Sequence, residues 1–165
     1  MKIISNLKTK TIKIVLIGFV FFLLLAIFFP VKDFAINEYK LKLFKKEVSA
    51  YIHPDFSKKI QTIAIVSNTA SSSNRCDLIV AEIYESAMSQ TDLQNAHDSV
   101  FQKHKENKNI NTQLFFLNKK SDVAILQNTF SDIYEKISML TKENSNAYVL
   151  ITTREILLNN DIRCH

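Results

Sequence analysis

A long uncharged run near the amino terminus constrains this chain more than any other feature of its sequence. No charged side chain occurs between Ile14 and Phe29, and the wider window of 20 positions, residues 12–31, contains only Lys13 at its edge. As a helix, 20 residues are about 30 Å long, which matches the hydrocarbon core of a bilayer. The run therefore predicts a transmembrane helix, which we place at residues 14–31.

The same run has two other interpretations, a cleaved signal peptide and a buried helix of a soluble protein. A signal peptide has a shorter apolar core, followed by a cleavage site flanked by small residues. Here the core continues into the bulky residues 27–30, and no cysteine follows it for lipid attachment. We therefore expect an uncleaved anchor.

Lysines flank the run on both sides, so the positive-inside rule alone does not fix the orientation. Four lysines precede the run, and five follow it within residues 32–46. We expect the short tail, residues 1–13, in the cytoplasm and the remaining chain in the periplasm. The location would then be a bacterial inner membrane, crossed once.

The two cysteines, Cys76 and Cys164, support an extracytoplasmic domain. Their spacing matches neither a zinc site nor a thiol-redox motif. In an oxidising compartment such a pair predicts a disulfide, which would tie the C-terminus to the middle of the domain. Two reduced, buried thiols are the alternative.

Charge and glycine content exclude several classes of function. From Ile60 onward the chain has 10 Lys and Arg residues against 12 Asp and Glu residues. The distal part is thus slightly acidic and lacks the clustered cations that direct nucleic-acid binding requires. The single glycine, Gly18, lies inside the apolar run, so glycine-dependent phosphate loops and nucleophile elbows are not expected in the domain.

Residues 32–54 are predicted to form a juxtamembrane stalk helix, which continues the membrane helix beyond a kink at Pro30. Phe34, Leu41, Phe44 and Val48 form an a/d-like stripe along this stalk. The stripe either packs on the chain's own domain or pairs with the stalk of a partner. These four residues are our candidates for partner contact.

Residues 55–165 are predicted to form a small periplasmic α/β sandwich of about three to four strands and three to four helices. Ser121 is a plausible N-cap for a long amphipathic helix. Residues 76–85 fit a helix by their apolar spacing, with a strand as the alternative because β-branched residues are dense. The other expected elements are strands at residues 60–66, 112–117 and 147–153, a helix at residues 92–106, and a hairpin about residues 159–160.

Catalytic chemistry finds little support in the sequence. His97 and His104 are seven residues apart, about 10 Å along a helix, which is too far to share a metal ion directly. We expect no enzyme, no cofactor, no metal and no small-molecule substrate. The two histidines are either ordinary exposed polar residues or candidate pH-sensing groups, whose protonation near pH 6.5 alters contact with a partner domain.

The tail at residues 1–13, the apolar run, the stalk and the cysteine pair together form a layout that resembles the MyfF/PsaF proteins. These are small inner-membrane companions of ToxR-like transcription activators of fimbrial operons, and ToxS is their functional counterpart. The resemblance is one of architecture and transfers no functional residue. It implies an accessory regulator that binds and stabilises or modulates a single-pass partner in response to acidity or temperature.

A second interpretation is a structural or assembly subunit of an envelope machine, such as a minor pilin-like or secretion component. Such subunits also have a long N-terminal helix and a C-terminal disulfide. However, no Gly-Phe cleavage junction precedes the apolar core, since the single glycine, Gly18, lies inside that core. The acidic residue early in the core is also missing, and Lys13 lies near its position. A tail of about 13 residues is too short to bind DNA specifically, so any regulation must pass through a partner.

Overall fold

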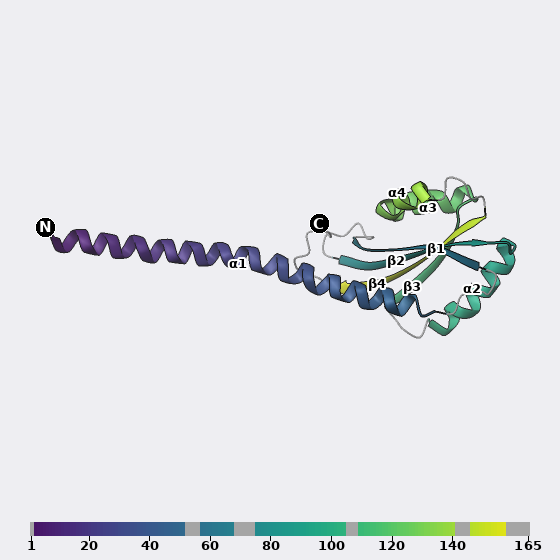
Figure 1. The fold of residues 1–165 in the computed structure, drawn as a ribbon, viewed down its shortest axis with the longest axis horizontal. Helices are drawn as coiled ribbons and strands as arrows, with labels where there is room; N and C mark the ends of the chain where they lie inside the picture. Colours follow the sequence, from purple (N-terminus) through teal and green to yellow (C-terminus); the bar gives the residue numbers. More distant parts are fainter. Residues whose placement is uncertain (1, 52–56, 68–74, 105–108, 141–145, 158–165) are drawn as a thin grey trace.

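The computed structural model describes residues 2–51, 57–67, 75–104, 109–140 and 146–157. A long helix leads from the N-terminus into a small domain, in which a four-stranded sheet is covered by helices (Figure 1). The predicted α/β class, with one long apolar N-terminal helix, is confirmed. The expected hairpin about residues 159–160 lies outside the described residues.

Helix α1 spans Lys2–Val48 and runs through Pro30 as one element. It joins the expected membrane segment to the expected stalk, although it ends six residues before residue 54, the expected end of the stalk. Lys45 and Lys46 lie in its last turn, where cations interact favourably with the negative end of the helix dipole. The backbone then turns, with the Tyr51 N–H donating to the Val48 carbonyl at 3.0 Å.

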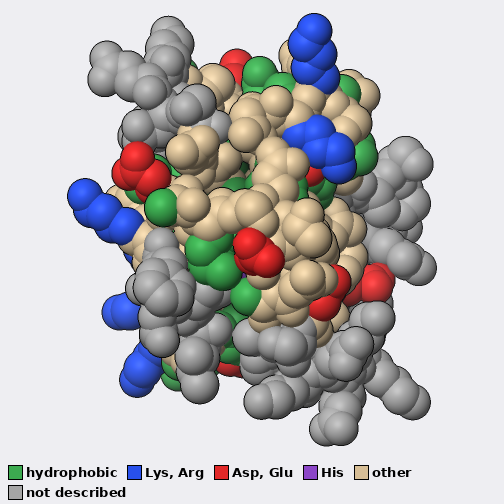
Figure 2. Space-filling model, turned by 90° about the vertical axis from the view of Figure 1, so that its right-hand side faces the viewer, with side chains coloured by type: hydrophobic (Ala, Val, Ile, Leu, Met, Phe, Trp, Pro, Cys, Tyr) green, Lys and Arg blue, Asp and Glu red, His purple; other side chains and the backbone are tan. Residues whose placement is uncertain are grey.

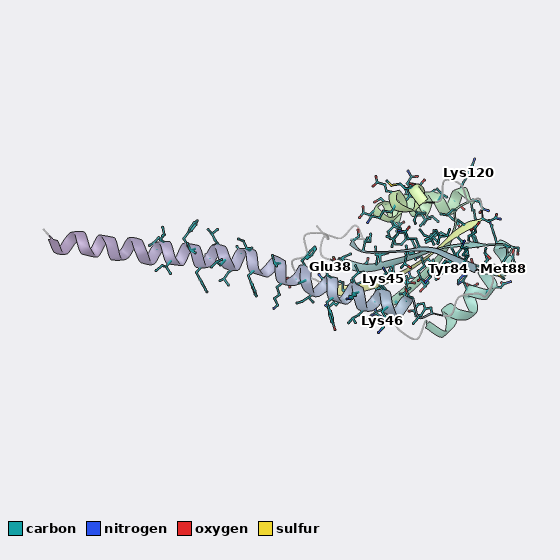
Figure 3. The ribbon with its side chains drawn as sticks, in the orientation of Figure 1. Glu38, Lys45, Lys46, Tyr84, Met88 and Lys120 are labelled. Atoms are coloured by element: carbon teal, nitrogen blue, oxygen red, sulfur yellow. The ribbon has the colours of Figure 1, made fainter. Side chains whose placement is uncertain are left out.

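The apolar part of α1 carries its side chains on all sides (Figure 3). Ile17 is 69% exposed and Phe22 is 68% exposed, and nothing in the described structure covers the segment. The helix is long and apolar enough to cross a membrane. Exposure of so many large apolar groups to water is unfavourable, so this segment is consistent with insertion into a bilayer.

The sheet has the order β1-β2-β4-β3, and every neighbouring pair is antiparallel. The two inner strands are β2 and β4, and both are buried on their two faces over much of their length. The outer strands pair on one side only within the described residues. The strands are β1 (Ser57–Ser67), β2 (Arg75–Ser86), β3 (Ile110–Phe116) and β4 (Ala147–Leu157).

Strand β2 overturns the helix that we expected at residues 76–85. Every side chain from Cys76 to Tyr84 is buried, because β2 lies in the middle of a sheet with helices on both faces. A strand buried on both sides loses the polar–apolar alternation that normally identifies strands. The dense β-branched residues indicated the correct alternative.

The sheet separates two helical layers (Figure 1). Helices α3 (Lys120–Thr129) and α4 (Ser131–Leu140) cover one face, where Leu126, Ile133 and Ile137 pack against β2 and β4. The other face is covered by the end of α1 and by α2 (Gln90–His104). The domain is therefore a three-layer arrangement, and α1 supplies part of one layer.

The long helix expected after Ser121 is two helices instead of one. Phe130 separates them, with φ −129° and ψ 48°, and its ring is only 6% exposed against Phe115. Insertion of this aromatic ring into the core interrupts the helix that the apolar spacing predicted. Ser121 is not the N-cap, because that position belongs to Lys119, which makes no capping bond through its side chain.

Candidate functional site

The predicted partner stripe on the stalk faces the chain's own sheet. Leu41 is 7% exposed, and Phe44 and Val48 are fully buried against β1, β2 and β4. The Arg154 guanidinium of β4 lies 4.5 Å from the Phe44 ring centre and pairs with Glu47 at 2.7 Å. Phe34, at 43% exposed, is the one candidate of the four that remains accessible.

Sequence reasoning missed a different apolar stripe on the outer face of the stalk. Ile36, Tyr39 and Leu43 are 39%, 64% and 50% exposed. Their spacing of three and four residues places them on one helical face, just beyond the expected membrane segment. The same periodicity was visible in the sequence, but the longer stripe beginning at Phe34 was the more regular of the two.

His97 is buried, contrary to the expectation of an exposed polar residue. Its side chain is 1% exposed, its Nε2 lies 3.3 Å from the Tyr148 hydroxyl oxygen, and its ring meets the Tyr148 ring edge-on. The backbone of His104 ends α2, and its side chain lies outside the described residues. The pH-sensing role of this pair stays a prediction.

A buried carboxylate organises the polar groups beneath α1 and α2. Glu82 is fully buried on β2 and accepts hydrogen bonds from Lys59 Nζ, from Tyr84 Oη at 3.0 Å and from Ser49 Oγ at 3.3 Å. The Tyr84 ring stacks on Tyr148 with centroids 5.3 Å apart. This Glu82 cluster therefore links the turn after α1 with β1, β2 and β4.

The electrostatics of the Glu82 cluster favour neutral tyrosines. Burial raises the pKa of Tyr84 far above its ordinary value, and the charge and hydrogen bond of Glu82 raise it further. Burial likewise raises the pKa of Tyr148. Because Glu82 is inaccessible and its donors are in place, the cluster is suited to hold elements together and has no access for a substrate.

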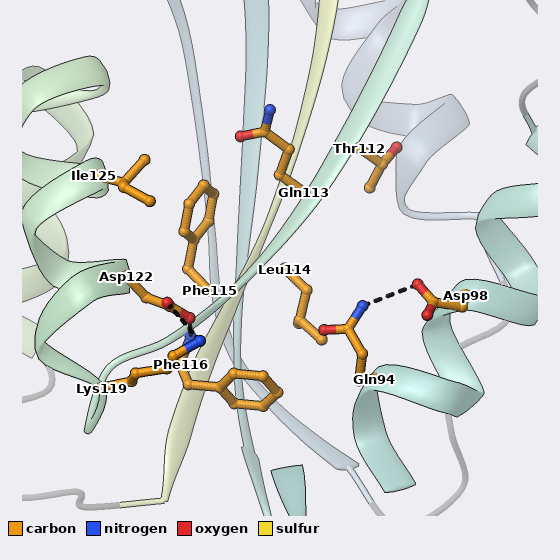
Figure 4. A pocket seen from close by; sticks show the side chains of 10 residues that line it. All are labelled: Gln94, Asp98, Thr112, Gln113, Leu114, Phe115, Phe116, Lys119, Asp122 and Ile125. Atoms are coloured by element: carbon orange, nitrogen blue, oxygen red, sulfur yellow. Dashed lines mark hydrogen bonds and ion pairs between the residues drawn. The ribbon is translucent and has the colours of Figure 1, made fainter. Parts of the chain in front are cut away.

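An open groove follows the outer edge of β3. It has a volume of about 740 Å³ and lies between α2 and α3 (Figure 4). Thr112, Gln113, Leu114, Phe115 and Phe116 of β3 form its floor. Gln94 and Asp98 of α2 line one side, and Lys119, Asp122 and Ile125 line the other.

The hydrogen bonds around this β3 groove fix its shape. Asp122 Oδ2 accepts a bond from the Phe116 N–H at 3.1 Å, and Asp122 Oδ1 pairs with Lys119 Nζ at 3.1 Å. On the opposite wall the Gln94 side chain donates to Asp98 Oδ1 at 2.9 Å. Ile125 is 48% exposed and supplies an accessible apolar contact.

Within the described residues, no group of three or more His, Cys, Asp and Glu side chains could hold a metal ion. The end of the domain farthest from the apolar segment of α1 carries acidic and basic side chains in mixed positions (Figure 2). Among the drawn residues, neither sign forms a broad surface there. The β3 groove is thus the most defined candidate binding site.

Cys76 is fully buried in β2, whereas Cys164 lies outside the described residues. The disulfide between them therefore stays a prediction.

Comparison with known proteins finds no matching family model, no matching curated protein and no matching solved structure.

Proposed function

We propose that this chain is a membrane-anchored accessory regulator whose periplasmic domain binds another single-pass membrane protein. The partner would be a ToxR-like activator of fimbrial transcription, which the domain stabilises or modulates in response to acidity or temperature. The observation that carries this proposal is α1, which continues without interruption from an exposed apolar segment into the core of the domain.

A continuous helix restricts the partners that the domain can meet. Leu41 is the first hydrophobic residue of α1 that belongs to the domain core, one turn after the buried Asn37. About nine residues separate it from the expected membrane segment, which corresponds to roughly 13 Å of helix. A second protein anchored in the same membrane would meet the domain at a high effective concentration, so a modest interface would suffice.

The exposed stalk stripe adds a second point of contact for such a partner. Ile36, Tyr39 and Leu43 follow the membrane segment on the same helix. A helix packing against them would have to leave the bilayer beside α1. This position favours a single-pass protein over a soluble periplasmic one.

Affinity purification of the full chain from mildly crosslinked membranes tests the proposal. We expect a DNA-binding single-pass protein to copurify, and deletion of the chain to lower fimbrial transcription at mildly acidic pH. Recovery of pilus or secretion subunits instead would support the assembly alternative. Unchanged transcription in the deletion strain would remove the regulatory role.

The response of fimbrial transcription to acidic pH tests the proposed role of the two histidines. Protonation of His97 would place a charge beside Tyr148, within a layer that also contains Tyr84, Glu82 and Lys59. Burial of an additional charge is costly, so acidity would loosen α2 from the sheet. We expect His97→Gln combined with His104→Gln to shift the pH at which transcription responds. An unshifted response would reject the pH-sensing role of these histidines.

A further inference from the structure

The outer edge of β3 presents backbone groups that no other described strand uses. The Phe116 N–H points away from β4 to Asp122, whereas the Leu117 N–H donates to Ala147 of β4 at 3.1 Å. In an antiparallel pair the direction of the peptide groups alternates along the strand. The N–H and C=O groups of Thr112 and Leu114 therefore point outward, into the β3 groove.

The two edge strands differ in how they are protected. Lysines on an edge discourage pairing with another strand, and β1 carries Lys58 and Lys59. Strand β3 has the sequence INTQLFF and no charged residue. In the described residues only the Phe116 end of its outer edge is capped, by Asp122.

The walls of the groove determine what shape of partner can reach the edge. Helix α2 lies on one side of β3 and α3 on the other, and residues of both line the groove (Figure 4). A single extended segment fits between two such walls. The edge of a complete sheet from a second copy would bring its own flanking helices against α2 and α3.

The lining also indicates the composition of that segment. Lys119 and Asp122 neutralise each other, which leaves Asp98 of α2 as the additional charge of the described lining. On the other wall, Ile125 offers an exposed apolar side chain next to Phe115. Successive side chains of a strand point to opposite faces, so basic residues would alternate with apolar ones.

We propose that the β3 groove binds an extended segment of a partner polypeptide, which adds to the sheet as a fifth strand beside β3. Its basic or polar side chains lie toward Asp98, and its apolar side chains lie toward Ile125. The backbone bonds to Thr112 and Leu114 provide affinity, and the two walls provide selectivity. This inference rests on the proposed function only in assigning the segment to a membrane-anchored partner.

A labelled peptide binding assay tests the groove directly. The full chain in detergent micelles is titrated with a fluorescent seven-residue peptide of alternating Lys and Val. Two further peptides serve as probes, one with Glu in place of Lys and one with Pro in place of every second Val. We expect the Lys–Val peptide to bind at least about tenfold more tightly than either, because charge and backbone donors both contribute.

Matched substitutions locate the binding. Thr112→Pro removes an outward N–H at an edge position that tolerates proline, whereas Thr112→Val keeps that N–H. We expect Thr112→Pro to weaken the Lys–Val peptide roughly tenfold and Thr112→Val to leave its affinity within about twofold. Ile125→Glu, on an exposed helix position, gives a second test that does not depend on the strand, and it should weaken binding while Ile125→Val does not.

Hydrogen exchange adds a structural readout. On binding, the amides of Thr112 and Leu114 should become protected while those of Lys58 and Lys59 in β1 do not change.

Equal affinity for all three peptides, protection at β1 instead of β3, or dimerisation of the chain through β3 would overturn the proposal. If a membrane partner binds wild type and Thr112→Pro equally well, the groove proposal fails and the proposed function stands. If the peptide tests succeed but no membrane partner is found, the groove proposal stands and the proposed function fails.

Discussion

At the scale of single residues, one irregularity in β1 explains how a carboxylate can lie buried in the sheet. Ala64 and Val66 face α1, while Ile63 and Ile65 face α3 and α4. The register shifts between Lys59 and Gln61, so that Lys59 pairs with Tyr84. Without this bulge Lys59 would follow the odd-numbered residues to the opposite face, away from Glu82.

Replacement of Glu82 tests this arrangement. In Glu82→Gln the ion pair with Lys59 is lost, although the neutral amide can still accept the Tyr84 bond. Since Lys59 is partly exposed and can return to water, we expect the free energy of unfolding to fall by only about 1–3 kcal/mol. The free energy of unfolding is measured by urea denaturation in micelles, monitored by circular dichroism. Glu85→Gln on the same strand is the control and should change stability by less than about 0.5 kcal/mol.

The buried tyrosines predict a loss of stability at alkaline pH. An unfolded tyrosine ionises near pH 10, whereas burial raises the pKa of Tyr84 and Tyr148 in the folded chain. Above about pH 10 the unfolded chain therefore releases protons that the folded chain retains. Stability is complete below that pH and falls as pH rises, by about 1.4 kcal/mol per pH unit for each such tyrosine.

Tyr84→Phe removes one of these groups and should flatten the decline above pH 10. Urea midpoints measured between pH 8 and 11 give the slope. Tyr39→Phe, at an exposed position of the stalk, should leave the slope unchanged. Parallel slopes for wild type and Tyr84→Phe would show that Tyr84 does not carry the effect.

At the scale of elements, the stalk helix is part of the domain core, and adjacent residues of α1 give a direct test. Phe44 is fully buried under the sheet, while Leu43 is 50% exposed. Phe44→Ala should lower the free energy of unfolding by about 3–5 kcal/mol through the lost contacts and the cavity. Leu43→Ala should change it by less than about 0.5 kcal/mol, and similar losses in both would contradict the packing.

Three of the four elements that the sequence predicted well keep a periodic contrast between buried and exposed positions. These are the 92–106 helix and the strands at 60–66 and 112–117. The strand at 147–153 also appears, although β4 is buried on both faces over most of its length. The prediction failed at β2, where burial on both faces removes that contrast. It also failed at Phe130, where one ring in the core divides a helix that periodicity alone makes continuous.

The candidate site was less predictable than the fold. The β3 groove depends on β3 being an edge strand and on α2 and α3 lying beside it. Strand order and helix placement are tertiary properties, and no spacing in the INTQLFF segment encodes them. The partner stripe was found as a pattern, but the sequence could not say whether the chain itself or a partner would cover it.

The predicted disulfide links two elements that are distant in sequence. Cys76 and Cys164 are 88 residues apart, so a bond between them would contribute at most about 4–5 kcal/mol in the chain-entropy model. Cys76→Ser and Cys164→Ser should then lower stability similarly and change mobility on non-reducing gels. A loss confined to Cys76→Ser would instead reflect burial of a hydroxyl in β2.

At the scale of the whole molecule, the chain is polarised along α1. One end is an exposed apolar helix, and the other is a domain with the β3 groove at its sheet edge. Since the domain core includes the end of α1, movement of the domain relative to the apolar segment must bend this helix. In the proposed function that segment lies in the bilayer, so α1 would constrain how a partner approaches the groove.

This polarity gives a prediction about topology. Ser5→Cys places a thiol in the expected cytoplasmic tail, and Lys120→Cys places one at an exposed position of the domain (Figure 3). In spheroplasts a membrane-impermeant maleimide should label Lys120→Cys, but label Ser5→Cys only after the inner membrane is opened. The wild-type chain, with its expected disulfide, is the background control.

The reverse labelling pattern would place the domain in the cytoplasm, which is compatible with neither the predicted disulfide nor a periplasmic partner. A labelled product released from the membrane without its first 30 or so residues would show that the apolar run is cleaved, and the close approach of domain and bilayer argued from α1 would then not exist.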